Sequence, residues 1–179
     1  MNRLPKERQM AVLSALVEGN SIRSTEPMTG VSQVTILRLL TEVGKRCMVI
    51  LEEQMQGFHS RYIEVDEIWC YVFKKEARLT EEDRTNHPER GDQYVFVALD
   101  AESKLIPTFL VGKRDGQTAL AFMEELRRRL AENGRIQLTT DGLNAYEKIG
   151  TGHLLGGNSL NYLMRDFKSW QLAQRTRWP

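Results

Sequence analysis

A strand pattern that carries an aspartate constrains the fold of this chain more than any other feature. Successive side chains of a strand point to opposite faces, and over residues 62–73 both faces are largely apolar. That pattern is typical of a central strand covered on both sides. Asp66 lies within it. An ionised carboxylate is costly in apolar surroundings unless it is paired or binds a metal. Asp66 is therefore predicted to be a site residue, with a buried ion pair as the alternative.

The elements that follow predict one sheet of mixed α/β class. Strands are predicted at 61–73, 93–99, 104–111 and 136–139, with a helix from Asp115 or Thr118 to about 132 before the last strand. Pro107 favours an edge position for the third strand. A meander of three antiparallel strands, then a helical crossover to a strand parallel to the first, gives the order 3-2-1-4. This is the topology of a ribonuclease H-like domain, and it brings Asp66 close to Asp141, just past the fourth strand.

The first 58 residues have helical periodicity instead. Helices are predicted over 5–18, from Ile22 to about Met28, and from Ser32 to about Gln56. This order is that of a helix-turn-helix, in which the first residues of the second helix of the pair meet base edges in the major groove. Those residues would be Ser32, Gln33, Thr35 and Arg38. The alternative is a three-helix packing unit without DNA contact.

Composition narrows the class of protein only a little. Hydrophobic residues make up 41%, charged residues 27%, and the net charge is +1, which describes a soluble globular protein and gives no indication of nucleic-acid binding by charge alone. No apolar run approaches the ~18 residues of a membrane-spanning helix, and the N-terminus lacks a signal-peptide pattern. A cytoplasmic protein is predicted. Residues 74–92, of which 11 of 19 are charged, are interpreted as a solvated loop.

Two converging carboxylates indicate metal chemistry. Mg²⁺ and Mn²⁺ prefer oxygen ligands, and two such ions can stabilise the attacking and leaving oxygens of a phosphodiester displacement. Asp66 is predicted to bridge the ions and Asp141 to bind one. For Asp141 the alternative is a strand-end turn, because Asp-Gly is a common turn pair.

Four stretches resemble transposases of the insertion-sequence-one family, which join a helix-turn-helix to a DDE-type ribonuclease H-like catalytic domain. They are residues 4–40, YIEVDEIWCYVFKK at 62–75, residues 91–130 and LTTDGLNAY at 138–146. The resemblance implies that Asp66 and Asp141 are the first two catalytic aspartates and that residues 31–38 read DNA. It also implies Mg²⁺-dependent cleavage at the terminal repeats of a mobile element, attack of the freed 3′-hydroxyl on target DNA, and a homo-oligomer on that DNA.

The resemblance does not supply the third carboxylate. The family has a Glu followed closely by Arg and Asn or His on a later helix, and no such pattern follows Asp141. Asp166 is the remaining candidate, on a helix expected near residues 162–172. The resulting division is a helix-turn-helix region at 1–58, an incomplete catalytic core at 59–150 and an atypical tail at 151–179, as in a truncated or frameshifted chain.

Three functions are compatible with these features. The first is an active transposase whose metal site is completed by Asp166 or by another chain. The second is an inactive transposase remnant that retains DNA binding. The third is a helix-turn-helix transcription regulator with a ligand-sensing domain, against which the paired aspartates argue, because a small-molecule pocket has no need of them.

Overall fold

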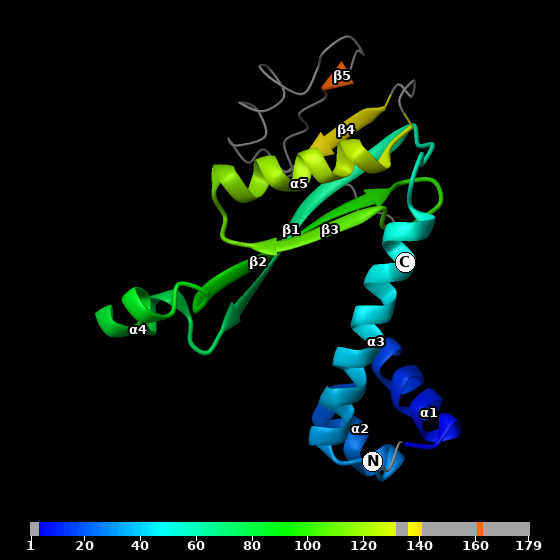
Figure 1. Cartoon of the computed structure of the whole chain (residues 1–179), viewed down its shortest axis with the longest axis vertical. Helices are drawn as coiled ribbons and strands as arrows, with labels where there is room; N and C mark the ends of the chain where they lie inside the picture. The colour runs from blue at the N-terminus through cyan, green and yellow to red at the C-terminus, as the bar shows by residue number, and fades with distance from the viewer. Residues whose placement is uncertain (1–3, 132–135, 141–160, 163–179) are drawn as a thin grey trace, which may run out of the picture. The chain divides into compact units, whose positions relative to one another are not determined.

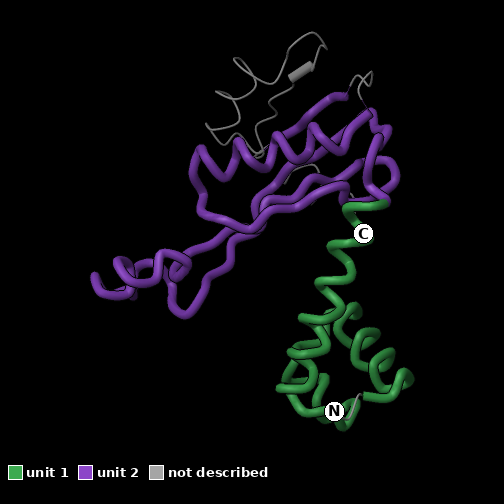
Figure 2. The backbone as a smooth tube through the Cα atoms, viewed as in Figure 1, with its two compact units in different colours: residues 1–53 green, residues 54–179 purple. Residues whose placement is uncertain are grey.

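The computed structural model describes residues 4–131, 136–140 and 161–162. The chain divides into two compact units, Met1–Glu53 and Gln54–Pro179 (Figure 2). The sequence-based boundaries at residues 58 and 150 stay predictions.

The first unit consists of three helices. They are α1 (Lys6–Val17), α2 (Ile22–Thr29) and α3 (Gln33–Gln54) (Figure 1). The hydroxyl of Ser21 caps α2 by accepting a hydrogen bond from the backbone N–H of Ser24 at 3.1 Å, as expected for a serine at this position. The three predicted helices are confirmed. None of the helices in the described parts of the chain, α3 included, has both the length and the apolar composition to cross a membrane.

A small apolar core holds these helices together. Val12 of α1 and Ile36 and Leu39 of α3 are buried in it, together with Val31 from the turn between α2 and α3. The core forms along the N-terminal half of α3 only, since every residue over 44–50 is exposed.

The second unit is built on one mixed sheet. Its strands are β1 (Tyr62–Val72), β2 (Gly91–Asp100), β3 (Thr108–Gly112), β4 (Gln137–Thr140) and β5 (Asn161–Tyr162). They lie in the order β3-β2-β1-β4-β5. β2 is antiparallel to β1 and β3, whereas β4 is parallel to β1 and β5. The predicted order 3-2-1-4 is therefore confirmed, β5 extends it, and the topology is ribonuclease H-like.

Helix α5 (Gly116–Arg129) connects β3 to β4 and covers one face of the sheet (Figure 1). The carboxylate of Asp115 caps it by accepting a hydrogen bond from the backbone N–H of Thr118 at 2.8 Å. At the centre of the core, Phe122 of α5 packs against Phe96 of β2 with 5.8 Å between ring centroids. Burial of this helix face fixes the crossover that brings β4 beside β1.

Two sequence-based expectations for this unit are corrected. Pro107 precedes β3 instead of lying inside it, although β3 does lie at the edge of the described sheet. The segment 74–92 is not a plain solvated loop, because it contains the 3₁₀ helix η1 (Glu76–Arg78) and the helix α4 (Glu81–Asn86). Their charged side chains form ion pairs with one another, which a count of charges does not reveal.

We expect Phe122→Ala to lower the free energy of unfolding of the second unit by about 3–5 kcal/mol, because it removes a fully buried aromatic ring and leaves a cavity. Leu120 lies on the same helix but is 38% exposed, so Leu120→Ala is a matched control with a much smaller expected loss. Urea unfolding followed by circular dichroism measures both. Equal losses in the two variants would contradict the position of Phe122 at the centre of the core.

Candidate functional site

Asp66 lies within β1, opposite Val97 of β2. Its side chain is exposed, and Oδ1 accepts a hydrogen bond from the backbone N–H of Glu67 at 2.8 Å. The predicted apolar surroundings of Asp66 are wrong. Helix α5 packs on the face of β1 that carries Ile63 and Val65, and alternation along the strand turns Asp66 to the other face. The carboxylate is thus accessible from solvent without a large desolvation cost.

The buried carboxylate of β1 belongs to Glu67 instead. Its side chain is 2% exposed, and Oε2 accepts a hydrogen bond from Nη2 of Arg114 at 3.2 Å. The Arg114 guanidinium also lies over the ring of Tyr94, 5.7 Å from its centroid. The ion pair considered for Asp66 therefore occurs one residue later, on the opposite face of the strand.

The strands β1 and β4 are paired up to the residues that precede the two predicted aspartates. Val65 of β1 pairs with Thr140 of β4 in the parallel register. The next residue along β1 is Asp66, and the residue after Thr140 is Asp141. Asp141 itself lies outside the described residues. The strand order that was expected to bring these two positions together is present.

Asp166, the candidate third carboxylate, also lies outside the described residues. Tyr162, at the start of the helix expected near residues 162–172, belongs to β5 instead. Within the described ranges, no group of three or more His, Cys, Asp or Glu side chains is arranged to hold a metal ion. The predicted ligand set is therefore represented in the described structure by Asp66 alone.

The described carboxylates on β1 are nevertheless of the ligand type that a hard divalent cation prefers. Glu64 is half-buried and lies two residues before Asp66, so the two side chains share one face of β1. Carboxylate oxygens are the ligands that Mg²⁺ prefers, but an octahedral ion takes about six ligands, more than these two residues provide. Sequence reasoning did not select Glu64, although its spacing of two from Asp66 on a strand is the signal that identifies it.

The predicted DNA-contacting residues gather at the start of α3. Ser32 directly precedes the helix, and its hydroxyl lies 3.0 Å from that of the half-buried Thr35. The side-chain amide of Gln33 donates a hydrogen bond to the carboxylate of Glu26 on α2. Arg38, one turn further along, is exposed. Among the four, Arg38 is thus the cationic side chain presented to solvent, whereas Gln33 is engaged within the unit.

Comparison with protein families decides the class of the second unit. Residues 89–176 match a family profile described as a DDE domain. This part of the chain, just under half of it, is therefore similar to DDE-type transposase domains. The matched part includes Asp141 and Asp166 and begins after Asp66. It also covers residues 151–176, for which the sequence alone revealed no family block. The predicted DDE-type character is confirmed, and membership of the insertion-sequence-one family stays a prediction.

Two solved structures are similar at low identity. One is described as the Mos1 strand transfer complex, with 16% identity, a TM-score of 0.34, and coverage of 92% of this chain and 59% of that chain. The other is a pre-cleavage Mos1 transpososome, with 15% identity, a TM-score of 0.31, and coverage of 92% and 60%. This chain thus spans about three-fifths of the length of those chains. A comparison with curated proteins gave no match.

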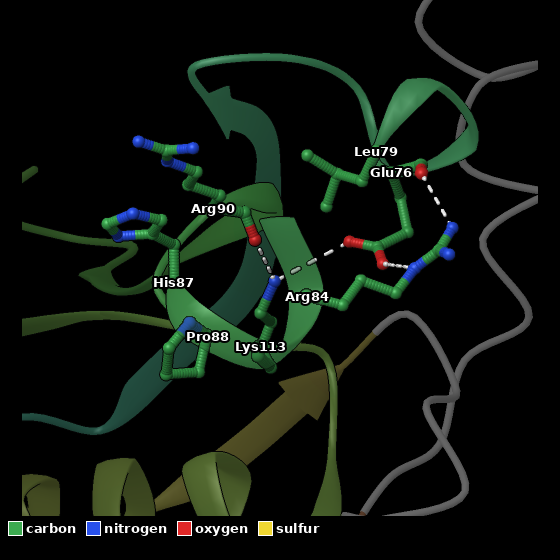
Figure 3. A pocket seen from close by; sticks show the side chains of 7 residues that line it. All are labelled: Glu76, Leu79, Arg84, His87, Pro88, Arg90 and Lys113. Atoms are coloured by element: carbon green, nitrogen blue, oxygen red, sulfur yellow. Dashed lines mark hydrogen bonds and ion pairs between the residues drawn. The ribbon is translucent and has the colours of Figure 1, made fainter. Parts of the chain in front are cut away.

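A pocket lies at the connection between β1 and β2 (Figure 3). This pocket has a volume of about 240 Å³ and is lined by Glu76, Leu79, Arg84, His87, Pro88, Arg90 and Lys113. Glu76 lies between two cations, 3.5 Å from Arg84 and 3.6 Å from Lys113. The ammonium of Lys113 also donates to the backbone carbonyl oxygens of Arg90 at 2.7 Å and Asp92 at 3.1 Å. These interactions hold the β1–β2 connection in place, so the pocket is interpreted as structural.

Gly91, the first residue of β2, allows this connection to close. Its φ of 87° lies in the left-handed region, which favours glycine. A Cβ atom at this position would collide with the carboxylate of Glu76 and lie 2.8 Å from Cδ1 of Leu79. The close approach of η1 to β2 therefore depends on the missing side chain.

Asp83 organises the helical part of the connection. The hydroxyl of Thr80 accepts a hydrogen bond from the backbone N–H of Asp83 at 3.1 Å, and the Asp83 carboxylate accepts one from the backbone N–H of Thr80 at 3.3 Å. Arg90 lies 2.5 Å and Lys74 3.6 Å from the same carboxylate. The hydrogen bond from the Thr80 backbone, with further ones from the Thr80 hydroxyl and Arg90, lowers the pKa of Asp83 to about 2.

This lowered pKa predicts a pH dependence of stability. Because the folded-state pKa of Asp83 lies below its ordinary value of 3.8, its contribution is present above about pH 4 and is lost as the pH falls towards about 2. We expect Asp83→Asn to reduce the free energy of unfolding at about pH 5 but to differ little from the wild type at about pH 2. Urea unfolding at the two pH values measures the difference. The same difference at both would contradict the assignment.

Proposed function

We propose that this chain acts as a transposase, which cleaves DNA at the ends of a mobile element and joins the freed ends to target DNA in the presence of Mg²⁺ or Mn²⁺. The observation that carries the proposal is the DDE domain over residues 89–176, together with an exposed aspartate on the neighbouring strand β1. Transposition is the activity that the domain class supports.

In this proposal, Asp66 and Asp141 bind the metal ions. Asp141 is the residue after Thr140, and Thr140 pairs with Val65, the residue before Asp66. Consecutive Cα atoms are about 3.8 Å apart, so each aspartate is one residue beyond this pair. Divalent ions, when bound, would polarise the phosphodiester and lower the pKa of the attacking hydroxyl. Asp66 offers its carboxylate on the face of the sheet opposite α5, where a DNA strand meets no helix of the described core. Asp166 remains the proposed third ligand.

The first unit is proposed to hold the DNA. A turn of three residues, 30–32, joins α2 to α3, as in a helix-turn-helix, and places Ser32, Gln33, Thr35 and Arg38 at the N-terminal end of α3. The proposed partners are the terminal repeats of the element and target DNA, bound by a homo-oligomer.

We expect Asp66→Asn to abolish metal-dependent cleavage, because it removes a charged ligand from the site while the exposed side chain contributes little to folding. The substrate is a plasmid that carries the DNA flanking the gene of this chain on both sides, incubated with Mg²⁺ or Mn²⁺. Nicked and linear products are measured on gels. Glu102→Gln, at an exposed turn, is the control and should cleave normally. Wild-type cleavage by Asp66→Asn would overturn the assignment of Asp66.

The same assay separates the alternatives. An inactive remnant predicts DNA binding without cleavage by either the wild type or Asp66→Asn. A ligand-sensing regulator receives no support from a DDE domain. A cytoplasmic location stays a prediction.

We expect Arg38→Ala to weaken DNA binding about three- to tenfold and, if Arg38 contacts a phosphate, to reduce the slope of log affinity against log salt by about 1. Arg127→Ala changes the charge by the same amount at an exposed position of α5 and is the control. Fluorescence anisotropy with labelled flanking DNA over a range of salt concentrations measures both. An equal loss in the two variants would argue against α3 as the DNA-contacting helix.

A further inference from the structure

Helix α3 continues about three turns beyond the core of the first unit. The residues over 44–50 are all exposed, and they include several apolar side chains. Ile50 is 58% exposed and Val49 is 55% exposed, although a helix in water normally buries an apolar face. This part of α3 therefore presents apolar surface that the core of its own unit does not use.

The apolar residues of α3 have the spacing of a coiled coil. Ile36, Leu40, Val43, Cys47 and Ile50 recur at alternating intervals of four and three, which keeps them on one side of a supercoiled helix. The first three pack into the core of the unit. The last two continue the same stripe beyond it and are exposed. One continuous seam is thus covered in its first half and open in its second.

The charged side chains beside the exposed half of the stripe can pair with the same side chains of a second copy. Arg46 and Glu53 are seven residues apart, so they lie on the same flank of the seam. Both are exposed, and neither forms an ion pair with another described residue. In two antiparallel copies related by a two-fold axis, the Cys47 layer of one helix meets Ile50 of the other. Arg46 then faces Glu53 across the pair, twice.

We propose that the C-terminal half of α3 is a self-association surface, on which a second copy of this chain binds in antiparallel orientation. A two-fold interface requires each surface to complement itself, and the Arg46–Glu53 arrangement meets that requirement only when the helices are antiparallel. In a parallel pair, Arg46 would face the flank that carries Leu51 and gain no ion pair. The inference deepens the proposed homo-oligomer by naming its contact surface, and it does not depend on the proposed metal chemistry.

The contact is short, and so the dimer is weak. An interface of this length falls below the ~1,000 Å² typical of stable complexes, and association is therefore concentration-dependent. Sedimentation equilibrium of the full chain, from about 1 to about 200 µM, should show a monomer–dimer equilibrium. A monomer at every concentration overturns the proposal.

The seam is tested with a matched pair of substitutions. Ile50→Asp places a charge in the seam of both copies and should weaken dimerisation about tenfold or more. Val49→Asp introduces the same charge one residue earlier, at similar exposure but off the seam, and should leave dimerisation within about twofold of the wild type. Circular dichroism confirms that both variants keep their helical content. Equal weakening by the two substitutions overturns the proposal.

The orientation is tested by exchanging charges. Arg46→Glu and Glu53→Arg each place like charges opposite one another in the antiparallel pair, so each should weaken dimerisation. The double variant R46E/E53R restores opposite charges and should recover the wild-type dimerisation constant. A double variant as weak as the singles overturns the antiparallel arrangement. DNA-cleavage activity is not part of this readout, so the inference fails or succeeds separately from the proposed function.

Discussion

Backbone pairing along both edges of β1 is the interaction on which the second unit depends. Antiparallel pairing with β2 extends over the ten residues from Ile63 to Val72, and parallel pairing with β4 covers its first four. A parallel neighbour requires a crossover, which α5 supplies by burying Phe122 and Leu126 against the sheet. The register of β4 is thereby fixed, so that Thr140 pairs with Val65, the residue before Asp66.

Alternation along β1 places its core-forming side chains on one face of the sheet and Glu64 and Asp66 on the other. Ile63, Val65 and Glu67 face α5, where the first two build the core and the third is paired with Arg114. Glu64 and Asp66 face the other side. A shift of one residue in register would exchange these sets and bury Asp66. The strand pairing that makes the core of the second unit thus also leaves the Asp66 carboxylate exposed to solvent.

In the first unit, the two halves of the long helix α3 have different surroundings. The N-terminal half of α3 is stabilised by contacts with α1 and the preceding turn, whereas its C-terminal half has the same periodicity without a partner in that core. Amphipathic helices derive most of their stability from such packing. The spacing of Cys47 and Ile50 therefore has a physical explanation only if something else covers them.

The sequence by itself determined the elements and the strand order 3-2-1-4, because helical and strand periodicities, turn residues and Pro107 are local signals. The DDE class came from the resemblance of four stretches of the chain to known transposases. It selected Asp66 correctly as a position on β1 but assigned it the wrong surroundings. Both faces of β1 are apolar in composition, and only the packing of α5 decides which of them is buried. Likewise, the ion pair of Glu67 with Arg114 joins residues 47 positions apart in the sequence, so no local pattern predicts it. Tertiary structure decided which carboxylates are structural and which face solvent, because burial depends on the element that packs against a strand and not on the strand alone.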